Sequence, residues 1–372
     1  MKPWLVAALL ACAACHGHED SPAGTAAADP APDLDPDELA LLASDAGMSL
    51  VPPPGAWTFV VLSDLHLPNY PANMKITGET IAALIALRPR AVIITGDFTN
   101  GTVLGGVSAR WWKTVRTALE PLRFAKIPVL PVAGNHDTYG PAQKAAYAAA
   151  FADLDQWAAP LVVHPAAAGG VAHAPFAYSV DIDGVHFALA HVVAQRLEPS
   201  ISEWLRADLA DAKSARARLV FGHVPMSSVV TPPNQKFVKQ FGAVLEQGHA
   251  DFYIAGHEHI VWDELAGLPA GGRLHQVLVG CSSGFYNFGP SKSSQGRAAC
   301  VPTEPPPGSK KQLVLRCAMP NGGGGFLLAP GRKKRLIQHH KNSFTIFTVD
   351  GANITVQPMT LDAKGHPVPF YL

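Results

Sequence analysis

Five short blocks of the sequence combine residue types that bind metal ions. Each block supplies Asp, Asn or His, and nearly every block directly follows a short apolar run. The blocks are Asp64-Leu65-His66, Gly96-Asp97, Gly134-Asn135-His136-Asp137, Gly222-His223 and Gly256-His257-Glu258-His259. Together they offer two metal ions a full set of oxygen and imidazole ligands. The chemistry that this combination indicates is metal-assisted attack on a phosphate ester.

The types of ligand indicate which metals would bind. Carboxylate, amide and imidazole groups suit Mn, Fe or Zn better than Ca, and the lack of thiolate ligands argues against a structural zinc site. An isolated Asp is usually a cap or turn residue. Five such blocks, nearly all directly after an apolar run, favour a metal centre over that simpler interpretation.

The elements that must position these blocks alternate between strand and helix. The first part of the chain predicts strands at 57–62, 91–95 and 128–132 and helices at about 76–87, 109–125 and 141–157. Such β-α-β-α-β alternation indicates a largely parallel sheet covered by helices.

The pattern changes in the second part of the chain. Strands at 176–182 and 185–190 are joined by Asp183-Gly184, which predicts a hairpin. Helices near 200–213 and 234–247 lead to strands at 219–221 and 252–255, and antiparallel strands are expected at 274–279, 344–349 and 354–359.

This order predicts that the five blocks meet at one sheet edge. Asp97, Asn135 and His223 each come just after a strand, at the carboxyl ends where open α/β sheets place ligands. Residues at i and i+2 of an extended strand end point to the same side, so Asp64 with His66, and His257 with His259, should each deliver a pair of ligands to one spot.

The blocks resemble the pattern of the calcineurin-like metallophosphoesterase family, D-x-H, G-D-x-x-D, G-N-H-D/E, H and G-H-x-H. The resemblance covers about residues 57–285. It implies an α/β fold, a four-layer α/β/β/α sandwich with two central mixed sheets flanked by helices. The last strands fit the family's closing sheet, so the metallophosphoesterase domain is expected to span 57–372.

The resemblance also implies a role for each block, with two divalent or trivalent transition-metal ions (Mn, Fe or Zn) as cofactors. A hydroxide held between the ions would attack phosphorus, with His136 as general acid and a small phosphate ester as substrate. One ion would take Asp64, His66, Asp97 and His259, and the other would take Asp97, Asn135, His223 and His257, with Asp97 bridging. Asn135, His136 and Asn100 are expected to contact the substrate.

One position departs from the family pattern. The second aspartate of G-D-x-x-D, which often orients the histidine of the third block, is Asn100 here. An amide can accept a hydrogen bond from His136 but cannot stabilise its protonated form by charge. We therefore expect a substrate with a better leaving group, or slower turnover. An alternative function is a membrane-tethered metal- or phosphate-binding protein with little turnover.

The N-terminus is typical of an export signal. Lys2 precedes the apolar run 3–14, which is too short to span a bilayer. The stretch before Cys15 resembles a bacterial lipoprotein signal, and an ordinary cleaved signal peptide is the alternative. We expect residues 1–15 to be the signal and 16–56 to be a flexible Pro/Ala/Asp-rich tether with one possible short helix at 37–46. The protein would then be periplasmic or in the cell envelope, anchored to the membrane by lipid at Cys15.

An insertion at about 286–342 interrupts the closing strands. It is rich in Pro and Gly and is expected either to line the rim of the site or to be disordered. Its basic run, Arg332 to Arg335, indicates a solvated turn or, alternatively, a contact with phosphate head groups. Cys300 and Cys317 are predicted to form a disulfide, with two free thiols as the alternative, and Cys281 to be a buried small hydrophobe.

Composition sets the limits of these expectations. The chain has 372 residues and is 48% hydrophobic, which indicates a globular protein. Lys+Arg and Asp+Glu balance at 29 each, so nucleic acid is not an expected partner. Among the remaining histidines, His191 is expected to be a core or rim residue, and lining the pocket is its alternative role.

Overall fold

The computed structural model describes residues 52–68, 71–102, 105–166, 173–228, 234–283 and 342–370, together with the backbone of three strands between 299 and 329. The predicted signal peptide, its Cys15 anchor, nearly all of the tether with its helix at 37–46, and the basic run at 332–335 lie outside the described residues. No helix among the described residues is long and apolar enough to cross a membrane.

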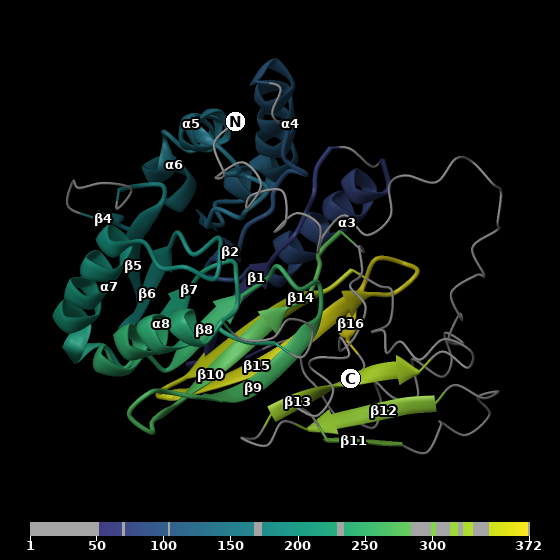
Figure 1. Cartoon of the computed structure of the whole chain (residues 1–372). Coiled ribbons are helices and arrows are strands. Elements are labelled where there is room, and N and C mark those ends of the chain that lie inside the picture. The colour runs from purple at the N-terminus through teal and green to yellow at the C-terminus, as the bar shows by residue number, and fades with distance from the viewer. Residues whose placement is uncertain are drawn as a thin grey trace, which may run out of the picture. The chain divides into compact units, whose positions relative to one another are not determined.

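A six-stranded sheet is built around the first predicted strands (Figure 1). Its order is β16-β15-β14-β1-β2-β3. β1, β2 and β3 run parallel, whereas β14, β15 and β16 add antiparallel neighbours at one side. Their bounds are β1 Trp57–Leu62, β2 Val92–Ile94, β3 Val129–Pro131, β14 Phe344–Asp350, β15 Asn353–Leu361 and β16 Pro367–Pro369.

A second, larger sheet has the order β11-β12-β13-β9-β10-β8-β7-β6-β5-β4. β6, β7, β8 and β10 run parallel, and the other described pairings are antiparallel. The bounds are β4 His164–Pro165, β5 Ala177–Ile182, β6 Val185–Ala190, β7 Ala217–Phe221, β8 Phe252–Ala255, β9 Val261–Gly267, β10 Arg273–Val279, β11 Ala299–Pro302, β12 Leu313–Ala318 and β13 Gly323–Ala329.

Side-chain alternation along the strands makes the two sheets pack face to face. In β1, Phe59 and Val61 join a buried cluster that also contains Phe187 and Phe221 of the second sheet. The intervening Val60 faces the opposite way and packs with helices. Fully burying each such side chain contributes about 1.5–3 kcal/mol, so this core fixes the register of both sheets.

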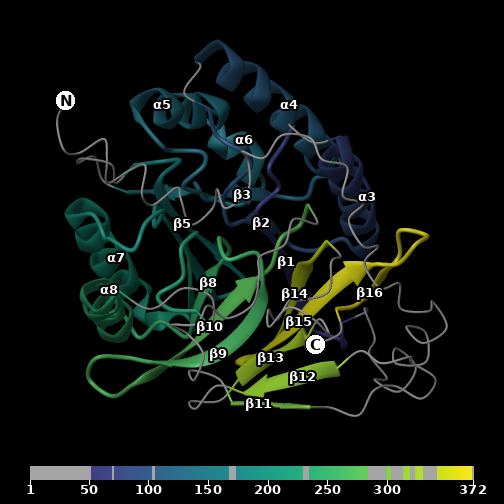
Figure 2. The ribbon, with the colours of Figure 1, turned by 45° about the vertical axis from the view of Figure 1, so that its right-hand side comes forward.

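Helices cover the outer face of each sheet (Figure 2). The first sheet carries α3 (Pro71–Leu87), α4 (Gly105–Phe124) and α5 (Pro141–Ala150), and the second carries α7 (Pro199–Asp211) and α8 (Gln235–Gln247). The architecture is therefore the expected four-layer α/β/β/α sandwich with two mixed sheets.

The structure corrects three details of the predicted elements. The helix expected at 141–157 is two helices, α5 and α6 (Leu154–Ala158). α5 ends at Ala150, because Arg116 of α4 donates to the Ala150 carbonyl and pairs with Asp153 at 2.7 Å. Strands β4, β9 and β16 were not expected. The insertion contributes strands β11, β12 and β13, which extend the second sheet through β9.

Candidate metal centre

The structure brings the five blocks together between the two sheets. Asp64 and His66 follow β1, Asp97 follows β2, and Asn135 follows β3. His223 follows β7, and His257 and His259 follow β8. Because both sets of parallel strands end at the same edge, the first sheet delivers four of the predicted ligands and the second delivers three.

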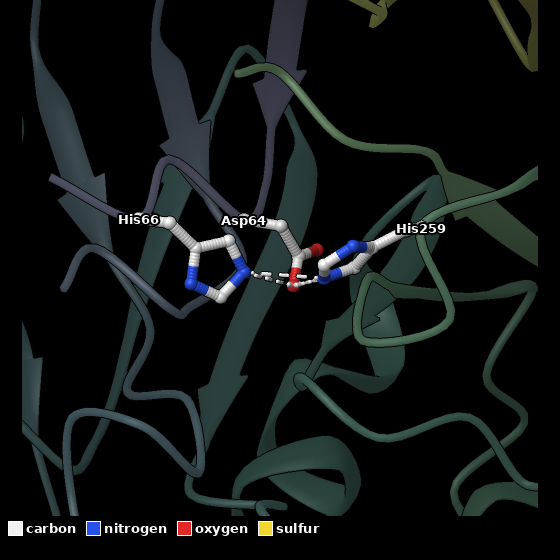
Figure 3. Close-up of side chains that lie close together, drawn as sticks. All are labelled: Asp64, His66 and His259. Atoms are coloured by element: carbon white, nitrogen blue, oxygen red, sulfur yellow. Dashed lines mark hydrogen bonds and ion pairs between the residues drawn. The ribbon is translucent and has the colours of Figure 1, made fainter. Parts of the chain in front are cut away.

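One cluster contains Asp64, His66 and His259 (Figure 3). His259 Nε2 lies 3.1 Å from Asp64 Oδ1 and 3.1 Å from His66 Nε2, and the distance from His66 Nε2 to Asp64 Oδ1 is 3.7 Å. Two ligand atoms at about 2.1 Å from one ion lie about 3 Å apart. The three side chains therefore point at a common position of the right size for a transition metal.

A second cluster contains Asp97, Asn135, His223 and His257. Asn135 Oδ1 lies 2.9 Å from His223 Nε2 and 2.9 Å from His257 Nδ1. Asp97 Oδ2 lies 3.2 Å from His223 Nε2. This oxygen and nitrogen set matches the second predicted metal position.

Asp97 connects the two clusters. Besides its contact with His223, it groups with His66 and His136 as a third set of possible ligands. Its Oδ1 accepts a hydrogen bond of 2.8 Å from the backbone N–H of His136. A carboxylate in this place is suited to bridge two ions.

The backbone at the ligands differs from the expected extended strand ends. Asp64, His66, Asp97, His257 and His259 all have positive φ, between 48° and 70°. This left-handed conformation costs non-glycine residues about 1–3 kcal/mol each and clusters at functional sites. The prediction that His257 and His259 bind at one spot is therefore wrong. His259 lies in the first cluster and His257 in the second.

Glycines in the blocks allow the chains to approach this closely. A Cβ on Gly134 would lie 2.1 Å from Asp97 Oδ1, and a Cβ on Gly256 would lie 1.8 Å from Ser63 Oγ and 2.5 Å from Asp64 Oδ2. No larger residue fits either position without displacing a ligand.

Charged groups in the centre shift one another's pKa values. Burial by itself raises the pKa of Asp64, but His259 and His223 outweigh it and lower the pKa to about 2. Burial likewise opposes the histidines around Asp97, and His223 and His136 hold its pKa well below the usual range. Both carboxylates are therefore ionised at neutral pH.

The imidazoles divide into two kinds. Burial, reinforced by His259, lowers the pKa of His66 to about 3, and burial with His223 lowers the pKa of His257 to about 3. His223 is different: burial lowers its pKa, but Asp97 outweighs burial and raises it to about 10. A proton on His223 therefore occupies the place between Asp97 and Asn135 where a cation would bind, and metal binding would release it.

These residues fit a transition metal in each cluster. Asp64 Oδ1 is buried and accepts no hydrogen bond from the described residues, although histidine nitrogens surround it. An ionised, buried oxygen without a donor is compensated by a bound cation. The imidazole and oxygen donors match Mn, Fe or Zn.

His136 lies beside the clusters without belonging to the predicted ligand set. Its Nδ1 lies 2.7 Å from the main-chain oxygen of Asn100, and its Nε2 lies 3.8 Å from Asp97 Oδ2. The predicted partner therefore acts through its backbone carbonyl, which any residue at position 100 supplies. The hydroxyl of Tyr139 is also close, at 2.8 Å from Nδ1 and 3.0 Å from Nε2.

Several residues that hold the ligands were missed from the sequence. Asp137 is buried and accepts hydrogen bonds from the backbone N–H groups of Phe98, Thr99 and Gly134, so it ties two of the blocks together. Burial, then Asp97, raises its pKa to about 7. Its place at the end of the third block was the available signal. The Thr95 carbonyl also holds a ligand, because it lies 2.7 Å from His223 Nδ1. Nothing in the sequence indicated this contact.

His191 is a buried core residue, which confirms the prediction of a core or rim position. Its ring packs edge-on against Phe176 at 5.2 Å, and neither ring nitrogen has a hydrogen-bond partner among the described residues. Burial lowers its pKa to about 3, so it is neutral.

Comparisons with known proteins agree with this geometry. Residues 58–261 match the model of the calcineurin-like phosphoesterase family, and all five blocks lie in that range. No curated protein matches the sequence.

Two solved structures share the fold. A purple acid phosphatase from yellow lupin (Lupinus luteus) seeds has a TM-score of 0.53 and 13% identity over 85% of this chain, and the chain spans only 53% of that protein. GAP50, the anchor in the inner membrane complex of Plasmodium, has a TM-score of 0.52 and 12% identity over 85% of this chain and 90% of that one.

Proposed function

Because the chain belongs to the calcineurin-like phosphoesterase family, a family of phosphoric ester hydrolases, we propose that it is a binuclear metal-dependent hydrolase of phosphomonoesters or phosphodiesters. The observation that carries the proposal is the arrangement of seven ligand side chains in two buried clusters connected by Asp97. The substrate would be a small phosphate ester.

Two bound transition-metal ions would supply an activated water and would neutralise the phosphate oxygens. Asp64, His66 and His259 would hold one ion, and Asn135, His223 and His257 the other, with Asp97 shared. Because Asn135 Oδ1 faces two imidazoles, its Nδ2 is left to donate to a phosphate oxygen.

His136 would protonate the leaving group. Its Nδ1–H donates to the Asn100 carbonyl, which fixes the ring and leaves Nε2 as the nitrogen that carries the transferred proton. Nε2 faces the connecting carboxylate Asp97 at 3.8 Å, so it lies beside the place where the phosphate would bind.

We also propose that the enzyme works outside the cytoplasm, tethered through Cys15. The support is the sequence alone, namely the short apolar run, the small residues before Cys15 and the Pro/Ala-rich tether. Labelling with radioactive palmitate tests the anchor: we expect incorporation into the native chain and none after Cys15→Ala.

The alternative, a tethered protein that binds metal or phosphate with little turnover, was motivated by Asn100. Its main-chain oxygen makes the contact with His136, so the missing carboxylate does not remove the orientation of that ring. This observation favours the enzyme.

Hydrolysis of p-nitrophenyl phosphate and bis-p-nitrophenyl phosphate by Mn-, Fe- or Zn-loaded protein tests the proposal. We expect turnover of at least one substrate, and its loss in Asn135→Ala and His136→Ala. No turnover of either substrate despite two bound ions would favour the binding protein.

A further inference from the structure

A sixth segment lies at the metal centre and was not among the blocks recognised in the sequence. Gly280, Cys281, Ser282 and Ser283 follow β10 directly. β10 runs parallel to β8, so its carboxyl end opens at the edge where His257 follows β8. The side chains of Cys281, Ser282 and Ser283 are all buried.

Two of these side chains converge on one atom of a predicted ligand. Ser283 Oγ donates a hydrogen bond of 2.9 Å to the main-chain carbonyl of Asp64, and Cys281 Sγ lies 3.3 Å from the same oxygen. Cys281 Sγ and Ser283 Oγ are also 3.3 Å apart. The Asp64 carbonyl oxygen thus has two hydrogen-bonding partners, both in the segment that follows β10.

Ser282 holds Ser63, the residue before Asp64. Its backbone N–H donates to the Ser63 carbonyl at 2.8 Å, and its hydroxyl accepts from the Ser63 N–H at 3.1 Å. The same hydroxyl donates to the carbonyl of Ser343, next to β14, at 2.8 Å. Polar turn residues usually cap their own chain, whereas here the contacts span 219 residues to Ser63 and 61 residues to Ser343.

Asp64 needs such support. Its φ of 56° is in the left-handed region, which is strained for a residue other than glycine. The N–H of Asp64 donates to the Gly96 carbonyl at 3.0 Å, so the Asp64 carbonyl is the backbone group that Cys281 and Ser283 hold. Rotation of the peptide after Asp64 would redirect the chain that leads to His66, whose Nε2 lies 3.7 Å from Asp64 Oδ1 in the same cluster. Groups that orient a metal ligand commonly change metal affinity about 10- to 100-fold when removed.

We propose that Cys281 and Ser283 are positioning residues for the metal ion held by Asp64, His66 and His259. They contact neither substrate nor ion and act through the Asp64 carbonyl. The inference rests on the proposed function, because it requires that this cluster binds a metal.

Mn²⁺ binding to metal-depleted full-length protein, followed by calorimetry, tests the proposal. Wild type is expected to bind two ions, and Ser283→Ala is expected to bind one as wild type does and the other at least about tenfold more weakly. Ser179→Ala is the matched control, because it also removes a buried hydroxyl that makes one hydrogen bond, to Asp208 at 2.6 Å in another part of the second sheet.

The outcomes separate this inference from the proposed function. Two ions bound by Ser283→Ala with unchanged affinities would overturn the inference alone, whereas a wild-type protein that binds no ion would overturn the proposed function. If Ser283→Ala fails to fold, as judged by circular dichroism, Cys281→Ala serves instead. It is expected to weaken the same ion, and unchanged affinities there would equally overturn the inference.

Discussion

His136 is oriented by a main-chain oxygen, which lowers the importance of the side chain at position 100. Asn100→Ala keeps the carbonyl that lies 2.7 Å from Nδ1, so we expect kcat within about threefold of wild type. His136→Ala removes the proposed proton donor, and we expect kcat to fall about 10²- to 10⁴-fold. Steady-state kinetics on bis-p-nitrophenyl phosphate measures both. An equally large loss in Asn100→Ala would show that the amide itself takes part.

Gly134 is required because a side chain there would occupy the place of a ligand. Its Cβ would lie 2.1 Å from Asp97 Oδ1, so we expect Gly134→Ala to lose at least one of the two ions. A Cβ on Gly78 in α3 would meet no atom of another element within 4 Å, and Gly78→Ala should stabilise the fold by about 0.5–1 kcal/mol. Metal analysis measures the ions bound by Gly134→Ala, and thermal unfolding measures the stability of Gly78→Ala. A Gly134→Ala protein with two ions would contradict this explanation.

Elements with a strong local pattern were predicted well. β1 and β8 have the predicted bounds, and the hairpin turns at Asp183-Gly184, whose φ values are 46° and 79°. Alternating apolar residues and turn types are properties of short stretches, so the sequence displays them.

The rest depends on contacts between distant residues. The end of α5 is set by Arg116 of another helix, and the separation of His257 from His259 is set by left-handed backbone at both. The role of Ser283 arises from an atom 219 residues away. No local pattern encodes these contacts. Local patterns therefore predicted the candidate ligands but not the residues that support them.

The pairing of strands β11 and β12 supports the predicted disulfide between Cys300 and Cys317. Their antiparallel register pairs Cys300 directly with Cys317. Opposite residues have Cα atoms about 4.5–5.5 Å apart, within the range of a disulfide. We expect one thiol, that of buried Cys281, when the oxidised mature protein is titrated under denaturing conditions. Three thiols would contradict the bridge.

His186 makes the stability of the whole molecule depend on pH. It is buried between Asp181 of β5 and Asp208 of α7, at 2.9 Å and 2.8 Å. Burial lowers its pKa, but the two carboxylates outweigh burial and raise it above 6.5. Because the folded state binds this proton more tightly, the stabilisation is complete below pH 6.5 and is lost as pH rises through the raised pKa.

Comparison of Tm across pH 6 to 9 isolates this contribution. Wild type should lose stability as pH rises, and His186→Gln should lose less over the same range, since it has no proton to release. Parallel curves for the two proteins would show that the site does not titrate there.

The metal centre joins the two sheets, since Asp64, Asp97 and Asn135 come from one and His223, His257 and His259 from the other. We propose that two ions act together in this centre. Titration of metal-depleted protein with Mn²⁺, while hydrolysis of bis-p-nitrophenyl phosphate and p-nitrophenyl phosphate is followed, tests this proposal. We expect hydrolysis of at least one ester to rise until two ions are bound per chain and then to level off. Saturation at one ion, or two bound ions without hydrolysis of either ester, would contradict it.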